Sequence, residues 1–243
     1  MIILKRKIKV FIAGDSTAAT KLPDKKPETG WGERIVELFS DSVEFINFAL
    51  NGRSSKSFID EGHLQKIKDL ISSGDFLFIQ FGHNDEKSDI ELHTDAFTTY
   101  KSYLKRYIEV AQNANATPVL LTSIQRRNFN EIKEITDTHG DYPIAMRELA
   151  IELNVNLIDM NEKTRILFNT LGPEKTKEIF LWVSPNESPN YPEGLQDNTH
   201  FNESGAKKIA ILVVEGIVEN KISPLNELVK DNFFNSYNIE VIY

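Results

Sequence analysis

Five short runs of β-branched and aromatic residues recur along the chain, and stretches with helical periodicity separate them. Some runs, such as residues 76–79, are apolar at every position rather than at alternate positions. Strands of this kind are buried on both faces, as happens when helices cover both sides of a parallel sheet. The runs are residues 8–13, 43–48, 76–81, 118–122 and 155–160. The sequence therefore predicts an α/β fold: a three-layer α/β/α sandwich around a mostly parallel five-stranded sheet.

Apolar residues spaced three and four apart predict helices between these strands. The marker positions are Ile35, Leu38 and Phe39; Leu64, Ile67, Leu70 and Ile71; Tyr100, Tyr103, Leu104, Tyr107 and Ile108; and Ile144, Leu149, Ala150 and Leu153. A last helix is expected over residues 201–220. The stretch before it, residues 184–199, is polar and contains three prolines, which is typical of a long functional loop.

The length of 243 residues fits one domain, which we expect to span residues 1–243. Its core is expected over about residues 7–220, and residues 221–243 form an extension to which the sequence assigns no role. Whether the chain forms a homo-oligomer is left open.

The charge balance limits the partners of the chain. There are 28 basic against 36 acidic residues, a net charge of −8, which repels nucleic acid and anionic membranes. The absence of cysteine excludes disulfides, thiolate metal sites and a cysteine nucleophile. The first sixteen residues are too mixed in character for a signal peptide, and no apolar stretch approaches the roughly 18 residues that cross a bilayer. We expect a cytoplasmic protein, or a secreted one if a leader has been removed.

Polar clusters follow three of the predicted strands, at residues 14–17, 51–54 and 82–85. A fourth cluster, residues 197–200, precedes the last helix. Ligand sites of open α/β sheets gather at the carboxyl ends of the strands. The clusters are therefore expected to meet at one edge of the sheet.

These clusters contain the groups that acyl transfer requires. A serine hydroxyl is a weak nucleophile until an imidazole removes its proton, and the imidazolium needs a carboxylate partner. Ser16, His200 and Asp197 fit these three catalytic roles, with Asp197 and His200 expected to come from one turn. An oxyanion also needs donors. The backbone amides of Ser16 and Gly52 and the side-chain amide of Asn84 are the candidates.

Each cluster also has a structural interpretation. Asp15 or Ser16 can cap a helix, His83 and Asn84 can stabilise a turn, and Asp197 can cap the last helix. Each of these explanations is reasonable alone. Together they leave unexplained why all the clusters occur in order at predicted strand ends.

The four clusters resemble the blocks that define the SGNH, or GDSL-like, hydrolase superfamily, with Ser16 in GDST, Gly52 in NGRS, Asn84 in GHND and His200 in DNTH. The resemblance covers about residues 7–220. The segments GDSTAA, GWGE, NGRSSKSF, FGHND, THGDYPIAMRELA and DNTHF are similar to those of rhamnogalacturonan acetylesterases in particular.

This resemblance implies a flavodoxin-like sheet and a Ser-His-Asp triad that removes acetyl groups from pectin-type oligosaccharides, with no metal and no cofactor. For such a substrate, His83, Arg53 and Tyr191 are the candidate binding residues. Arg53 is suited to a uronate carboxylate and Tyr191 to stacking on a sugar ring.

Three other functions remain as alternatives. A lysophospholipase or thioesterase of the same fold would need an apolar acyl groove. A metal-dependent phosphoesterase could use hard ligands such as Asp15, Asp85 and His83, but would leave Ser16 without a purpose. An inactive carbohydrate-binding protein would not need a complete set of nucleophile, base and carboxylate.

Overall fold

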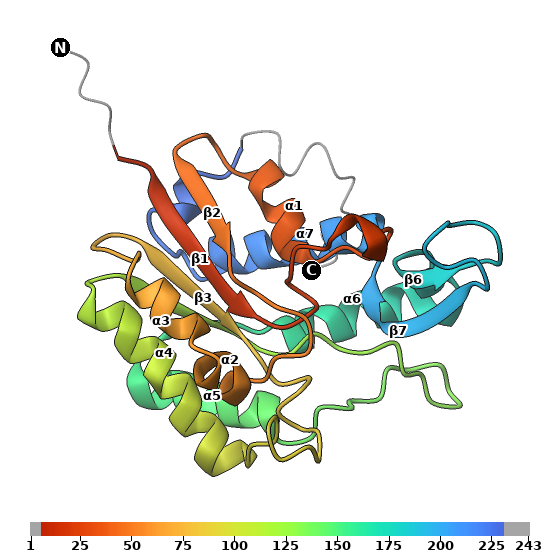
Figure 1. The fold of residues 1–243 in the computed structure, drawn as a ribbon, viewed down its shortest axis with the longest axis horizontal. Coiled ribbons are helices and arrows are strands. Elements are labelled where there is room, and N and C mark those ends of the chain that lie inside the picture. The colour runs from red at the N-terminus through yellow and green to blue at the C-terminus, as the bar shows by residue number, and fades with distance from the viewer. Residues whose placement is uncertain (1–5, 231–243) are drawn as a thin grey trace.

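The computed structural model describes residues 6–230, which form a central parallel sheet between two layers of helices (Figure 1). Its five strands lie in the order β2-β1-β3-β4-β5, and every neighbouring pair is parallel. The strands are β1 (Ile8–Gly14), β2 (Val43–Asn47), β3 (Phe76–Gln80), β4 (Thr117–Leu121) and β5 (Asn156–Ile158). This order is that of flavodoxin-like sheets, and it confirms the predicted fold class.

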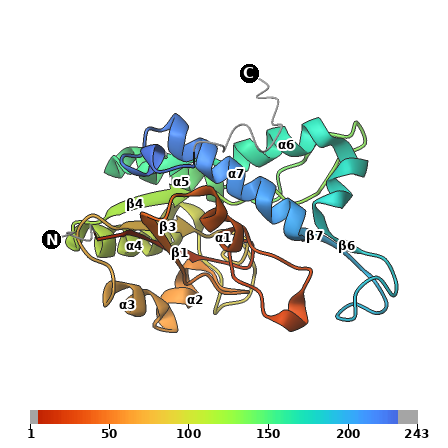
Figure 2. The ribbon, with the colours of Figure 1, turned by 90° about the horizontal axis from the view of Figure 1, so that it is seen from above.

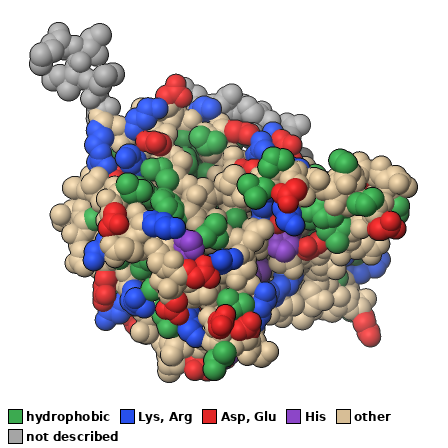
Figure 3. All heavy atoms as spheres, in the orientation of Figure 1, with side chains coloured by type: hydrophobic (Ala, Val, Ile, Leu, Met, Phe, Trp, Pro, Cys, Tyr) green, Lys and Arg blue, Asp and Glu red, His purple; other side chains and the backbone are tan. Residues whose placement is uncertain are grey.

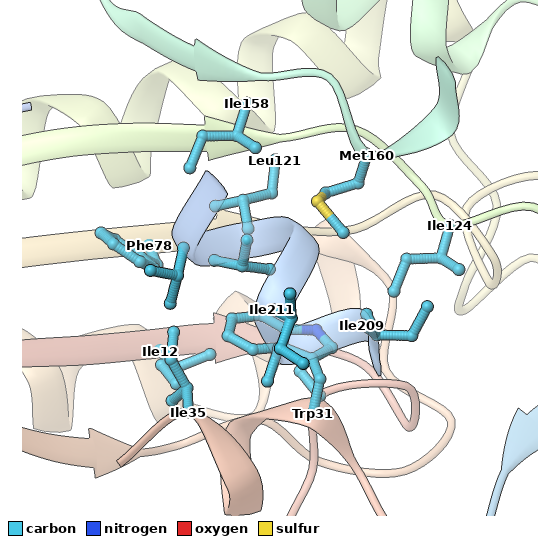
Figure 4. Close-up of a cluster of buried hydrophobic side chains, with 14 of the residues drawn as sticks. Ile12, Trp31, Ile35, Phe78, Leu121, Ile124, Ile158, Met160, Ile209 and Ile211 are labelled. Carbon is cyan, nitrogen blue, oxygen red and sulfur yellow. The ribbon is translucent and has the colours of Figure 1, made fainter. Parts of the chain in front are cut away.

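Alternate residues of each strand face opposite helical layers. Val10 and Ile12 of β1 belong to one buried cluster, whereas Phe11 and Ala13 belong to the other. Figure 4 shows the first cluster, in which strand residues such as Ile12 and Phe78 meet side chains of α7. Because both faces are buried, the strands read as continuous apolar runs.

Helices α1, α6 and α7 cover one face of the sheet, and α2, α3, α4 and α5 cover the other (Figure 1). Their bounds are α1 (Trp31–Arg34), α2 (Ser55–Asp60), α3 (His63–Lys68), α4 (Lys101–Asn113), α5 (Tyr142–Leu153), α6 (Met160–Lys175) and α7 (Glu203–Glu219). The helices expected near residues 64–71, 100–108, 144–153 and 201–220 correspond to α3, α4, α5 and α7. Ile35 and Leu38 lie in a short 3₁₀ turn, Ile35–Leu38, that follows α1, and Phe39 comes directly after it in extended conformation, so no longer helix forms here.

Helix α6 was not predicted, and it shortens the fifth strand. That strand was expected to reach residue 160 but ends at Ile158, because the Asp159 side chain accepts a hydrogen bond from the backbone N–H of Glu162 and caps α6. The Gly172-Pro173 pair near the end of α6 interrupts its helical geometry and obscures the periodicity.

A second, smaller sheet also escaped prediction. Strands β6 (Phe180–Val183) and β7 (Leu195–Phe201) pair antiparallel and project beyond one end of the central sheet (Figure 2). The long loop expected over residues 184–199 therefore ends at residue 194, and the residues after it form β7. The apolar run Phe-Leu-Trp-Val of β6 is a strand signal that the sequence does contain.

The described part of the C-terminal extension packs beside the edge of the sheet. Ser40 donates a backbone hydrogen bond to Leu228 and Lys230 donates one to Leu38, at 2.9 and 3.0 Å. Residues 231–243 of the extension lie outside the described residues. Over residues 6–230, no helix is long and apolar enough to span a membrane. Acidic and basic side chains are mixed over the face seen in Figure 3.

Candidate active site

Ser16 lies in a tight turn immediately after β1, at the carboxyl end of the sheet. The backbone N–H groups of Ala18 and Ala19 both donate to the carbonyl of Asp15, at 3.2 and 3.1 Å, so the chain turns sharply after the strand. Gly14 pairs with Gln80 in the parallel register of β1 and β3. Residues 82–85 therefore emerge at the same edge as Ser16, as the sequence predicts.

Asp197 and His200 lie within β7, where an irregularity brings them together. Phe180 pairs with Phe201 and Trp182 pairs with Gln196, so residues 197–200 of β7 lie opposite only residue 181 of β6. In the resulting bulge, Asp197 Oδ1 accepts hydrogen bonds from the backbone N–H groups of Thr199 and His200, at 2.7 and 2.9 Å. The expected turn therefore exists, but inside a strand rather than in a loop.

The bulge aligns three functional groups in a row. His200 Nε2 lies 2.8 Å from Ser16 Oγ, and His200 Nδ1 lies 2.7 Å from Asp197 Oδ2. Although burial raises the pKa of Asp197, hydrogen bonds and charge from His200 and the N–H of Thr199 lower it to about 2. Because the ionised carboxylate only accepts hydrogen bonds, a neutral imidazole next to it carries its hydrogen on Nδ1. The Nε2 lone pair is then free to accept the Ser16 proton.

Three N–H groups are available close to Ser16. Within residues 6–230, no acceptor is recorded for the backbone N–H of Ser16 or of Gly52. Asn84 donates one side-chain N–H to the carbonyl of Arg53 at 2.9 Å and retains a second. The arrangement can therefore activate a hydroxyl and offer donors to a developing oxyanion.

The backbone conformation at position 52 favours glycine, whereas the space around it does not. Its φ of +77° lies in the left-handed region, and a Cβ added there would meet no described atom within 4 Å. Glycine adopts this conformation without steric cost, and this reason for a glycine at position 52 is not visible in the sequence.

A second imidazole and carboxylate pair lies under the site. His83 Nδ1 is 3.2 Å from Asp15 Oδ2, and both side chains are buried. Burial raises the pKa of Asp15, but His83 and the N–H and hydroxyl of Thr17 outweigh that effect and lower it to about 2. Burial lowers the pKa of His83, despite Asp15. A neutral His83 can donate from Nδ1 to Asp15, while its buried Nε2 has no hydrogen-bond partner among the described residues.

A cavity of about 580 Å³ opens over Ser16. Its walls come from segments far apart in the sequence: Ser16, Lys25, Glu28, Asn51, Gly52, His83, Asn84, Lys87, Arg126, Leu181, Tyr191, Leu195, Asp197, Thr199 and His200. The predicted nucleophile, base, acid and oxyanion donors all lie on this one cavity.

Two of the three predicted substrate-binding residues, His83 and Tyr191, also line the cavity. Tyr191 donates its hydroxyl hydrogen to the carbonyl of Lys25 at 2.9 Å. Arg53, the third, lies elsewhere in this structure. Its guanidinium pairs with Glu61 at 2.9 Å and does not line the cavity, and its carbonyl instead holds Asn84.

Sequence reasoning missed a buried ion pair beneath the nucleophile. Lys21 Nζ lies 2.6 Å from Glu28 Oε1, and it donates to the carbonyl of Ser16 at 2.5 Å and to Asn51 Oδ1 at 2.7 Å. Burial lowers the pKa of Lys21, and Glu28 opposes that shift. No periodic spacing identifies this lysine, because Ser16, Glu28 and Asn51 meet its ammonium only once the loop after β1 has folded.

Sequence reasoning also missed the support behind the bulge. The backbone N–H of Arg127 donates to the carbonyl of Asn198 at 2.8 Å, and Trp182 Nε1 donates to Asn198 Oδ1 at 3.0 Å. The guanidinium of Arg127 and the ammonium of Lys177 lie 4.7 and 4.9 Å from the centre of the Trp182 ring. Trp182 therefore anchors the bulge.

The carboxylates that a metal site would use as ligands already accept hydrogen bonds within the protein. Asp85 Oδ1 accepts from the hydroxyls of Ser55 and Thr94, at 2.5 and 3.1 Å, and Asp15 accepts from Thr17 and His83. Among residues 6–230, no group of three or more His, Asp or Glu side chains is arranged to hold a metal ion.

Comparison with known proteins agrees with this geometry. The chain is 46% identical over 217 residues to the rhamnogalacturonan acetylesterase RhgT of Bacillus subtilis, which covers 89% of this chain and 92% of that protein. It is 39% identical to the probable rhamnogalacturonan acetylesterase YesY of the same organism, over 91% of this chain and 98% of that protein.

Among solved structures, YxiM of Bacillus subtilis superimposes with a TM-score of 0.77 at 23% identity, over 89% of this chain and 58% of that chain. This likeness concerns the fold. The family model described as GDSL-like Lipase/Acylhydrolase matches residues 10–213. With Ser16, Gly52, Asn84 and His200 gathered around one cavity, the chain belongs to the GDSL-like lipase/acylhydrolase family.

Proposed function

We propose that this protein is a serine carbohydrate esterase that removes O-acetyl groups from rhamnogalacturonan-type or related oligosaccharides through an acyl-enzyme. The observation that carries the proposal is the row of contacts from Ser16 Oγ to His200 Nε2 and from His200 Nδ1 to Asp197. The extensive similarity to two proteins named as rhamnogalacturonan acetylesterases supports the substrate class.

In the proposed mechanism, His200 takes the proton of Ser16 as its oxygen bonds to the acetyl carbonyl carbon. The negative charge that forms on the carbonyl oxygen is met by the N–H groups of Ser16, Gly52 and Asn84. Collapse of this intermediate expels the sugar oxygen, which takes the proton from His200. Water then repeats the sequence on the acetyl-serine, and acetate leaves.

The chemistry of the cavity wall supports an acidic carbohydrate as substrate. Lys25, Lys87 and Arg126 bring positive charge to the cavity and Glu28 and Asp197 bring negative charge, so basic residues outnumber acidic ones there although the protein carries a net charge of −8. Arg126 shares its charge with Glu86 at 2.5 Å, and Lys25 has no carboxylate partner within the described residues. Charged side chains suit a uronate-containing chain better than a long acyl group. The proposed binding residues are His83 and Tyr191, which line the cavity. The role of Arg53 in binding, the single domain and the cytoplasmic location stay predictions.

Acetate release tests this function. The substrates are acetylated rhamnogalacturonan oligosaccharides, acetylated xylo-oligosaccharides as a neutral comparison, and 4-nitrophenyl esters from acetyl to octanoyl. We expect acetate release from the acidic oligosaccharide and a rate that falls with acyl length. Ser16→Ala should lose several orders of magnitude in kcat while remaining folded. Rates that rise with chain length, by roughly 0.8 kcal/mol of binding per methylene, would instead identify a lipid or thioester hydrolase.

A further inference from the structure

Lys87 makes a contact with Asn84 that the proposed mechanism does not use. The Lys87 ammonium donates to Asn84 Oδ1 at 2.7 Å, and the backbone N–H of Lys87 donates to the Asn84 carbonyl at 3.2 Å. The turn at residues 84–87 therefore folds the lysine back over the amide. In the part of the chain that the structure describes, no ion pair of 4.0 Å or less joins this ammonium to a carboxylate, and its hydrogen-bond acceptor is Asn84 Oδ1.

The two partners of Asn84 define which way its amide faces. An ammonium only donates and a carbonyl only accepts, so Oδ1 must face Lys87 and Nδ2 must face the carbonyl of Arg53. A reversed amide would place two donors together and two acceptors together. It would also turn the amide oxygen toward the carbonyl oxygen of a bound ester, where negative charge develops. The observed orientation leaves one N–H of Asn84 for that oxygen.

The charge on Lys87 also strengthens the donor. A hydrogen bond from a cation to an amide oxygen withdraws electron density from the amide nitrogen, so the remaining N–H becomes a better donor. Asn84 is only 4% exposed, whereas Lys87 is exposed, so water screens part of the charge and the expected gain from it is modest. The benefit grows with the negative charge on the substrate oxygen, and it is therefore larger in the transition state than in the bound substrate.

We propose that Lys87 is a positioning residue for ester hydrolysis: it fixes and polarises the side-chain amide of Asn84 so that one N–H is ready for the oxyanion. This inference rests on the proposed function, because it assigns Asn84 to the oxyanion. It differs from a role for Lys87 in substrate binding, in which the ammonium would meet the sugar directly and act independently of Asn84.

A double-mutant cycle on Lys87 and Asn84 tests the proposal with 4-nitrophenyl acetate, which has no sugar and no charge. Asn84→Ala should lower kcat by about 10²–10³-fold, the usual effect of one oxyanion donor. Lys87→Met should lower kcat less, by roughly tenfold, with KM almost unchanged, because it weakens that donor without removing it. In the Asn84→Ala background, Lys87→Met should change kcat by less than about twofold, since the amide through which it acts is gone.

Two further variants separate orientation from charge. Lys87→Arg keeps a charged donor and should recover most of kcat, whereas Lys87→Gln keeps an uncharged donor and should recover only part. Thermal unfolding of each variant is measured beside the kinetics, and Lys87→Gln replaces Lys87→Met in the cycle if the latter does not fold.

The outcomes separate this proposal from the proposed function. If Ser16→Ala abolishes hydrolysis but Lys87→Met lowers kcat equally with and without Asn84, or changes only KM, the positioning role is wrong and the esterase assignment stands. An unchanged kcat in Lys87→Met also overturns it. If Ser16→Ala retains the full rate, both proposals fall.

Discussion

The ammonium of Lys21 holds the backbone carbonyl of Ser16 from inside the protein, at 2.5 Å. Its side chain is 1% exposed and its counter-ion Glu28 is 9% exposed, so the pair has little contact with water. A buried ion pair of this kind adds little net stability when complete, but removal of one member leaves a charge without a partner. Lys21 therefore links the position of the nucleophile to the stability of its surroundings.

Replacement of Lys21 tests this link. Lys21→Met should lower the free energy of unfolding by about 3–5 kcal/mol, because it strands the carboxylate of Glu28. The double variant Lys21→Met/Glu28→Gln should recover part of the loss, since it removes the unpaired charge. Urea denaturation of the three proteins provides the comparison. A single variant as stable as the wild type would show that Glu28 is solvated or protonated instead.

Asp197→Asn should lower kcat by roughly 10²–10⁴-fold while the fold remains, because the amide cannot hold the required imidazole tautomer or stabilise its charged form. The lowered pKa of about 2 means that Asp197 contributes stability that is complete above about pH 4 and is lost as the pH falls through 2. As the pH falls from about 4 to 2, the wild type should therefore lose more unfolding free energy than the variant, each compared with its own value at neutral pH. Steady-state kinetics at pH 7 and acid titration by circular dichroism measure both effects. Near-normal kcat in the variant would remove Asp197 from the catalytic set.

Asp85 should make stability depend on pH in the opposite direction. Burial raises its pKa to about 7, despite hydrogen bonds from Ser55 and Thr94, compared with 3.8 in an exposed chain. The folded protein therefore holds a proton that the unfolded chain releases. The stability from that proton is complete below about pH 4 and is lost as the pH rises through 7.

The matched variant is Asp85→Asn, which mimics the protonated acid. Between pH 4 and pH 8 the wild type should lose about 2–4 kcal/mol of unfolding free energy relative to Asp85→Asn. Urea denaturation at four pH values across this range measures the difference. Parallel pH profiles for the two proteins would mean that Asp85 stays ionised when buried.

Gly82→Ala should destabilise the turn that carries His83 and Asn84. A Cβ on Gly82 would lie 2.0 Å from Ser123 Oγ, and the φ of +147° disfavours any side chain. Overpacking at such a position costs about 1–3 kcal/mol. Ser123→Ala removes the clashing oxygen, so the double variant should regain part of the melting temperature, and additive losses in the two single variants would contradict the steric explanation.

Much of this molecule was predictable, because the strands and the site depend on local patterns. Strands buried on both faces appear as apolar runs, and parallel strands bring the residues that follow them to one edge, so Ser16, Gly52 and Asn84 were found together. The bulge around Asp197 was predicted only as a turn, since the pairing of β7 with β6 depends on residues about fifteen positions away. Arg127 was missed as a support because its partners Thr176 and Asn198 come from other segments. Lys21 and Lys87 were missed because no periodic pattern shows that an ammonium folds back onto nearby residues such as Ser16 and Asn84. A basic residue in a motif also does not reveal its ion-pair partner, which for Arg53 is Glu61.

The bulge in β7 carries both the carboxylate and the imidazole, whereas Ser16 is attached to the central sheet. Asp197 and His200 are therefore carried by one segment, and the 2.7 Å contact between them does not depend on how the two sheets are placed. The contact that does depend on that placement is the one from His200 to Ser16. The hydrogen bond from the backbone N–H of Arg127, outside the small sheet, to the Asn198 carbonyl helps to set it, whereas Trp182 supports the bulge from within the small sheet.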